Sequence, residues 1–173
     1  MADENHSVKT LPLEALHIAA SAKFGAFAGW NMPLSYPLGV MKEHLHTRSA
    51  AGLFDISHMQ LVAVTGVDAL AFLSHALPLD PNLMADGQSK YIFLLNENAG
   101  IDDDLIVTRL SATRFMIVAN ASRAVEDVAE LKLRATGFNV TVEALQRVTL
   151  ALQGPLAEQA LKSAGLSDLP SLL

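Results

Sequence analysis

The feature that most constrains the fold is a run of strand-like segments separated by very short turns. Residues 90–96, 104–110 and 114–120 are rich in Ile, Val, Leu and Phe, and the first two flank the turn sequence Asn-Glu-Asn-Ala-Gly. Parallel strands need a long crossover connection, whereas antiparallel strands can be joined by a tight turn. The run therefore predicts a β-hairpin and a third strand in an antiparallel sheet, rather than a doubly wound parallel sheet.

Helices and further strands are expected on both sides of this run. Apolar spacing, an early proline and terminal glycines predict helices over residues 12–24, 40–51, 67–76, 122–136 and 154–165. Further strands are expected over residues 53–65, 138–143 and 147–153, and residues 27–33 are expected to form a compact loop. The order predicts an α+β fold with largely antiparallel sheets and flanking helices.

The length and composition indicate one domain of ordinary size or two small lobes. The chain has 173 residues, of which 51% are hydrophobic and 17% charged, so it can bury a substantial core. We expect one lobe from about residues 1–52 and 140–173, and a second from about residues 53–139. The apolar end of the chain, just after a helix, favours a piece of a longer protein.

The charge and residue content exclude several function classes. The net charge of −6 and scattered basic residues argue against nucleic-acid binding. No apolar stretch approaches the ~18 residues of a membrane helix, and the polar first residues do not resemble a signal peptide. With no cysteine in the chain, we expect a protein of a reducing compartment, the cytoplasm. The histidines are not spaced as metal ligands, so no metal site is expected.

Three consecutive carboxylates, Asp102 to Asp104, run directly into the strand that follows the turn. Like charges side by side repel one another, so the arrangement invites a chemical explanation. Successive strand residues point to opposite faces, which places Asp104 with Ile106 and Thr108 on one face and Asp103 on the other. From the residue types alone, a solvated turn is the favoured interpretation of all three.

Four segments, in order along nearly the whole chain, resemble the glycine cleavage system T-protein family, the aminomethyltransferases. They are Phe27-Ala-Gly-Trp-Asn-Met-Pro-Leu-Ser-Tyr36, Leu53-Phe-Asp-Ile-Ser-His-Met59, the segment 96–107, and Leu152-Gln-Gly-Pro155. The resemblance implies a folate-binding aminomethyltransferase-like fold that is incomplete. It covers about the N-terminal half of the family, and the C-terminal half, with a later folate-site segment, is absent here.

The resemblance also implies a reaction. The lipoylated H-protein of the glycine cleavage system would deliver an aminomethyl group, and its one-carbon unit would pass to tetrahydrofolate with release of ammonia. This chain alone is expected to be inactive. Two alternatives stay open: a folate-dependent demethylation domain of a dimethylglycine- or sarcosine-oxidising enzyme, and a non-catalytic folate-binding protein of iron–sulfur assembly.

Family matching further implies the site residues. Asp104 would be the catalytic carboxylate, which stabilises positive charge on the transferred carbon and orients the folate amine. Asn120 would contact folate through its amide, and Met59 and Tyr91 would line the pocket. The alternatives are a helix cap for Asn120 and ordinary core packing for Met59 and Tyr91.

Two departures from the family pattern lie next to these residues. Ala99 stands where glycine is usual, so we expect no positive φ there. Asp102 stands where an apolar residue is usual, and its charge is expected to raise the pKa of a neighbouring aspartate.

Overall fold

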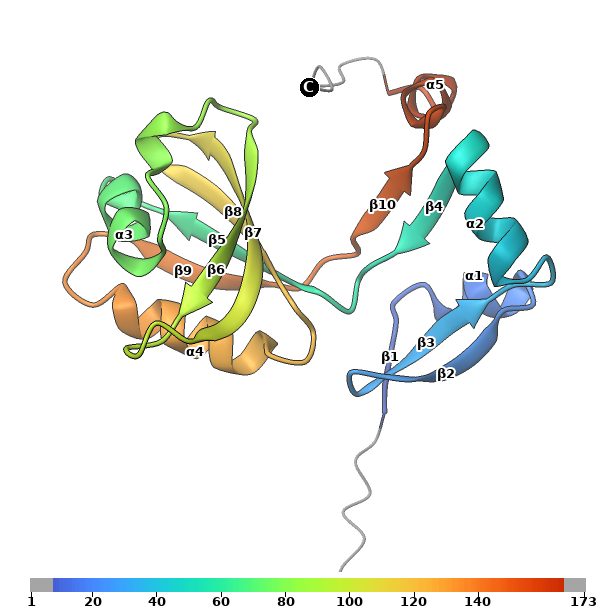
Figure 1. The fold of residues 1–173 in the computed structure, drawn as a ribbon, viewed down its shortest axis with the longest axis horizontal. Helices are drawn as coiled ribbons and strands as arrows, with labels where there is room; N and C mark the ends of the chain where they lie inside the picture. Colours follow the sequence, from blue (N-terminus) through green and yellow to red (C-terminus); the bar gives the residue numbers. More distant parts are fainter. Residues whose placement is uncertain (1–7, 167–173) are drawn as a thin grey trace, which may run out of the picture. The chain divides into compact units, whose positions relative to one another are not determined.

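A computed structural model describes residues 8–166 of the chain, which fold as two compact units. Unit 1 comprises the described residues up to His58 and from Val148 onward, and unit 2 comprises Met59–Arg147. Figure 1 shows the ribbon of each unit. The architecture is α+β with mainly antiparallel sheets and flanking helices, which confirms the expected fold class.

Unit 1 contains two small sheets and three helices among the described residues. Its elements are β1 (Lys9–Thr10), α1 (Glu14–Ala19), β2 (Lys23–Phe27), β3 (Trp30–Ser35), α2 (Val40–Ser49), β4 (Gly52–Asp55), β10 (Leu150–Gln153) and α5 (Ala157–Ser163). One sheet has the order β1-β3-β2, in which β1 and β3 are parallel, and in the other β10 pairs antiparallel with β4.

The expected loop over residues 27–33 was wrong, because this stretch belongs to the hairpin of β2 and β3. Phe27 pairs with Trp30, and the two residues between them have positive φ, 48° at Ala28 and 79° at Gly29. This is the backbone shape of a two-residue turn matched to the twist of a hairpin. The expected helix over 12–24 is correspondingly shorter, since α1 ends at Ala19 and β2 follows.

Unit 2 is a five-stranded antiparallel sheet with two helices packed on one face. Its elements are β5 (Gln60–Thr65), α3 (Ala69–Ala76), the 3-10 turn η1 (Pro81–Leu83), β6 (Ser89–Leu95), β7 (Ile101–Ser111), β8 (Arg114–Ala119), α4 (Ala124–Arg134) and β9 (Thr141–Leu145). The strand order is β6-β7-β8-β5-β9. The expected hairpin and third strand are therefore confirmed as β6, β7 and β8.

The main hydrophobic core lies between this sheet and its helices. Apolar residues of α3 recur at helical spacing, and Phe72 and Leu73 are fully buried. They meet alternate residues of the strands, among them Leu105 and Ile117, and Leu131 of α4. The helices cover one face of the sheet, and the other face carries exposed side chains such as Tyr91 and Ile106.

The boundaries between the units lie a few residues later than the lobes expected from the sequence. The expected strand over 53–65 is two strands, β4 and β5, which belong to different units. β4 stays in unit 1 because it pairs with β10, and β9 stays in unit 2 because it pairs with β5. The boundaries near 52 and 140 are thereby corrected to the positions after His58 and before Val148.

Candidate functional site

Asp103 and Asp104 lie on opposite faces of the unit 2 sheet, as the alternation along β7 predicts. Asp103 is 8% exposed and shares the helix-covered face with Leu105, which is fully buried. Asp104 is half-buried and shares the opposite face with Ile106, which is 40% exposed. Asp104 is therefore a carboxylate that a ligand can reach, whereas Asp103 faces the protein interior.

The open face around Asp104 is aromatic and apolar. Asp104 pairs with Phe93 across the hairpin, and Ile106 pairs with Tyr91. Paired residues share a face, so Tyr91 lies diagonally next to Asp104. A hydrogen bond with the Asp104 carboxylate raises the pKa of the Tyr91 phenol above its ordinary value. The structure thus brings together two of the residues expected in the site.

Asn120 follows β8 and binds both aspartates. Its backbone N–H donates to Asp103 Oδ2 at 3.2 Å, and its side-chain Nδ2 donates to Asp103 Oδ1 at 2.9 Å. The same Nδ2 donates to the backbone carbonyl of Asp104 at 3.2 Å. Both N–H bonds of the amide are used within the protein, so the carbonyl oxygen Oδ1 is the part left for a ligand.

Met59 lies at the same end of the sheet as Asn120. It precedes Gln60, which pairs with Ala119, the neighbour of Asn120. Met59 is half-buried and is the first residue of unit 2. The structure therefore places Met59, Asp104 and Asn120 at one end of the sheet, with Tyr91 on the adjacent strand β6.

In the turn before β7, Ala99 has a positive φ of 59°, so the expectation of no positive φ at this residue was wrong. Asn96 organises this turn, because its Oδ1 accepts hydrogen bonds from the backbone N–H groups of Asn98 and Gly100. The Nδ2 of Asn96 donates to Asp102 Oδ1 at 3.0 Å, so the side chain of Asp102, at the start of β7, is held by the turn.

Asp102 does not raise the pKa of its neighbour as expected. Burial raises the pKa of Asp103, but hydrogen bonds from Asp127, from Asn120 and from the backbone of Asp104 together lower it below its ordinary value. Asp127 lies on α4 and is fully buried. Asp127 was not predicted as a site residue from the sequence, although it lies one helical turn before Leu131 on the buried side of the helix.

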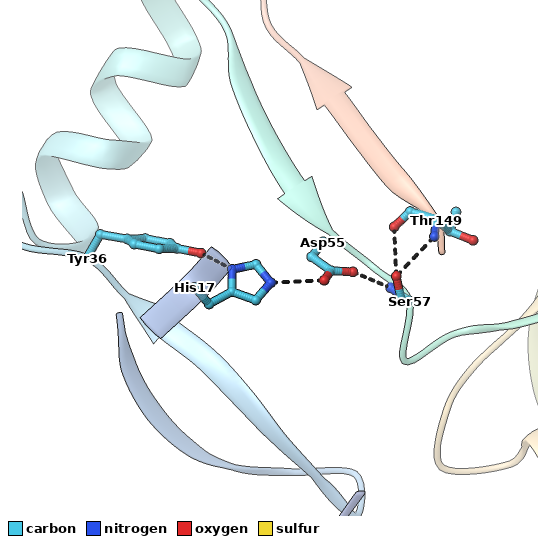
Figure 2. Close-up of polar contacts among 5 residues, drawn as sticks. All are labelled: His17, Tyr36, Asp55, Ser57 and Thr149. Atoms are coloured by element: carbon cyan, nitrogen blue, oxygen red, sulfur yellow. Dashed lines mark hydrogen bonds and ion pairs between the residues drawn. The ribbon is translucent and has the colours of Figure 1, made fainter. Parts of the chain in front are cut away.

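Unit 1 contains a second polar cluster, which the sequence analysis also missed. His17 of α1 lies between Tyr36 and Asp55, with Nδ1 2.8 Å from the tyrosine hydroxyl and Nε2 2.9 Å from Asp55 Oδ2 (Figure 2). The Asp55 side chain is 1% exposed, and its Oδ1 accepts from the backbone N–H of Ser57. Ser57 in turn exchanges hydrogen bonds with the backbone of Thr149.

The local electrostatics indicate that this cluster is structural. Burial raises the pKa of Asp55, but hydrogen bonds from Ser57 and His17 lower it below its ordinary value. The cluster joins α1 to β4 and to the chain entering β10. A signal was present in the sequence, because His17 lies one turn after Leu13 on the expected apolar face of its helix.

Other parts of the described structure have fewer features of a functional site. A cavity of about 240 Å³ in unit 1 is lined by Leu34, Leu38 and Phe54 among others, and by none of the expected site residues. Within residues 8–166, no group of three or more acidic or histidine side chains is arranged to hold a metal ion. The helices in the same range are too short or too polar to cross a membrane.

Comparisons with known proteins give a consistent result. Residues 13–171 match the family described as the GCVT N-terminal domain. The aminomethyltransferase of Desulfitobacterium hafniense (strain DSM 10664 / DCB-2) is 41% identical over 167 residues, which cover 95% of this chain and 46% of the relative. An aminomethyltransferase of Thermus thermophilus is 40% identical over 164 residues, covering 94% of this chain and 46% of the relative.

A solved structure is similar along the same length. The crystal structure of glycine cleavage system aminomethyltransferase T from Bartonella henselae is 63% identical, with a TM-score of 0.93. The match covers 96% of this chain and 46% of that chain. This chain therefore spans about half the length of the relatives that it matches.

Proposed function

The chain belongs to the GCVT N-terminal domain family, and from that premise we propose that the protein is an aminomethyltransferase of the glycine cleavage system. In this proposal the one-carbon unit passes from the aminomethyl-lipoyl arm of the H-protein to tetrahydrofolate, and ammonia is released. The names of the relatives support the reaction class, and the four motifs support the donor and the acceptor. A cytoplasmic location is part of the same proposal, since the chain has no cysteine.

The observation that best supports a role for Asp104 is its position on the open face of the sheet. Its carboxylate lies beside Tyr91, and its backbone carbonyl is held by the amide of Asn120. A fixed carboxylate stabilises positive charge that develops on a carbon during transfer, and exclusion of water strengthens the effect. We assign this electrostatic and orienting role to Asp104.

The surroundings of Asp104 fit a flat ligand that bears ring nitrogens. Tyr91 and Phe93 are 62% and 40% exposed on the same face, so aromatic surface is available for a planar ring. The free Oδ1 of Asn120 can accept a hydrogen bond from a ring N–H, and Met59 offers an adaptable thioether. Tetrahydrofolate, when bound, supplies the amine that accepts the one-carbon unit.

The two alternatives from the sequence are not favoured. The relatives and the solved structure are named aminomethyltransferases, not oxidising enzymes or iron–sulfur assembly proteins.

The proposed reaction is tested with the protein in the full length that its gene encodes. Purified protein is mixed with aminomethylated H-protein and tetrahydrofolate, and both ammonia and methylenetetrahydrofolate are measured. We expect the two products in equal amounts and neither when H-protein or tetrahydrofolate is left out. Failure to form methylenetetrahydrofolate with all components present would contradict the proposal.

Whether the 173 residues hold the whole folate site is tested separately. Isothermal titration with tetrahydrofolate should give weak or undetectable binding, because part of the ligand's surroundings is expected to lie outside this chain. Tight binding would show that the folate site is complete here.

A further inference from the structure

Asp127 is a fully buried carboxyl group that the proposed function does not use. It lies on α4 at 0% exposure, and neither of its carboxyl oxygens meets a protein N–H or hydroxyl donor among residues 8–166. The Nε of Arg123, one helical turn earlier, is also buried and without an acceptor in that range. A carboxylate in this position would be a charge removed from water without compensation, so its protonation state needs an explanation.

The group that Asp127 meets is the carboxyl of Asp103 on β7. Ionised carboxyl groups contain only acceptor atoms, so two of them form a hydrogen bond only when one keeps a proton. Asp103 already accepts two hydrogen bonds from Asn120, and these favour its charged form. Asp127 receives no such support, so Asp127 is the member of the pair that keeps the proton.

The charges around Asp127 agree with this assignment. Burial, followed by the hydrogen bond with Asp103 and the negative charge of Asp103, raises the pKa of Asp127 to about 8. The positive charge of Arg123 lowers this pKa and the negative charge of Glu126 raises it, but both are smaller effects. Asp103, in contrast, has a pKa below its ordinary value.

We propose that Asp127 is a positioning residue: it keeps a proton at neutral pH and donates a hydrogen bond to Asp103, which in turn fixes Asn120 beside Asp104. The order of contacts is Asp127 to Asp103, Asp103 to the amide of Asn120, and that amide to the carbonyl of Asp104. The inference deepens the proposed function and rests on it, because Asn120 and Asp104 are the residues proposed to meet tetrahydrofolate.

Loss of the Asp127 proton would disturb the site from the helix-covered face of the sheet. Two negative carboxylates would then face each other in a buried position, and their repulsion would move the Asp103 carboxylate from its place. The Asn120 amide would lose its fixed acceptor, and the Oδ1 offered to a ligand would lose its orientation. Folate binding should therefore weaken as Asp127 ionises.

Two substitutions separate a proton donor from a space-filling group. The amide of Asp127→Asn is a permanent donor of nearly the same shape, so it imitates the protonated acid at every pH. Asp127→Leu fills the space but donates nothing. The control is Glu126→Gln, which removes a carboxylate from the adjacent, exposed position of the same helix.

The first measurement does not depend on the ligand. Carboxyl ¹³C and side-chain amide ¹⁵N signals of the 173-residue chain are followed from about pH 5 to about pH 10. We expect one aspartate carboxyl to titrate near pH 8 and the Asn120 amide signal to move with it. Both transitions should vanish in Asp127→Asn and persist in Glu126→Gln, and the Asn120 signal of Asp127→Leu should be displaced at neutral pH. An Asp127 carboxyl that titrates below about pH 5, or an Asn120 amide signal that does not change as Asp127 titrates, would overturn the inference.

The second measurement concerns the ligand and uses the full-length protein. Tetrahydrofolate affinity of the unsubstituted protein should fall about tenfold between neutral pH and about pH 9.5, and this fall should be absent in Asp127→Asn. A fall of the same size in Asp127→Asn would overturn the role of Asp127. If the unsubstituted protein binds no tetrahydrofolate at any pH while the two signals titrate together, the proposed function is wrong and the positioning of Asn120 by Asp127 stands.

Discussion

Asp103 and Asp104 are adjacent residues of β7, but their side chains lie on opposite faces of the sheet and have different surroundings. Asp103 points to the helix-covered face, where Asn120 and Asp127 hold its carboxylate. Asp104 points to the open face, where Tyr91 is its neighbour. Because side chains alternate between the faces of a strand, Asp103 contacts the protein interior, whereas Asp104 is accessible from the open face.

Ala99 gives a prediction at the same scale, because its φ of 59° is unfavourable for any residue with a Cβ atom. Ala99→Gly removes that strain, and after the added chain entropy of glycine it should raise the free energy of unfolding by about 0.5 kcal/mol. Urea denaturation measures this change. The control is Ala129→Gly on the exposed side of α4, which should lower the free energy by about 1 kcal/mol. Destabilisation of equal size by both substitutions would contradict the account of the turn.

Among the elements, α1 is joined to β4 through His17 and Asp55 (Figure 2). His17→Ala removes both ring hydrogen bonds and leaves a nearly buried Asp55 side chain with fewer donors. We expect the free energy of unfolding to fall by about 2 kcal/mol, measured by urea denaturation followed through the fluorescence of Trp30. His44→Ala, on the exposed surface of α2, should change it by less than about 0.5 kcal/mol. Equal effects of the two substitutions would show that the cluster does not stabilise unit 1.

The packing of α4 on the sheet predicts a pH dependence of stability. Because folding raises the pKa of Asp127 from 3.8 to about 8, the favourable contribution of its protonated form is complete below the unfolded pKa. It is lost progressively as the pH rises from the unfolded pKa to about 8, and above about 8 nothing further is lost. Asp127→Asn, which has no proton to lose, should become progressively more stable than the unsubstituted protein over that window. The difference should grow by on the order of 3 kcal/mol between about pH 6 and about pH 9, measured by urea denaturation at several pH values. A difference that is constant with pH would mean that Asp127 is already ionised at neutral pH.

How well the sequence predicted each element depended on whether its signal was local. The β6–β7 hairpin and the facing of Asp103 and Asp104 follow from turn residues and a period of two, and both were predicted. The β2–β3 hairpin was missed because Ala28 and Gly29 look like a general loop, while their positive φ values appear only in the structure. Asp127 was missed because it looks like a solvated charge on an amphipathic helix until Asp103 is placed opposite it.

For the whole molecule, the four motifs identify the family, but they do not define a complete site. The expected site residues all lie in unit 2, on or next to β5, β6, β7 and β8. The chain spans 46% of the length of its solved relative. In the proposed reaction, Asp104 stabilises the charge that develops during one-carbon transfer.

The most direct test of that claim is the turnover of Asp104→Asn in the full-length protein. The substitution keeps the shape of the side chain and removes its charge, so kcat for tetrahydrofolate-dependent ammonia release should fall at least about 100-fold, with an unchanged unfolding midpoint. Asp102→Asn is the matched control, because it removes a charge two residues away at the start of β7 and should leave kcat within about twofold. Turnover of Asp104→Asn equal to that of the unsubstituted protein would contradict the account.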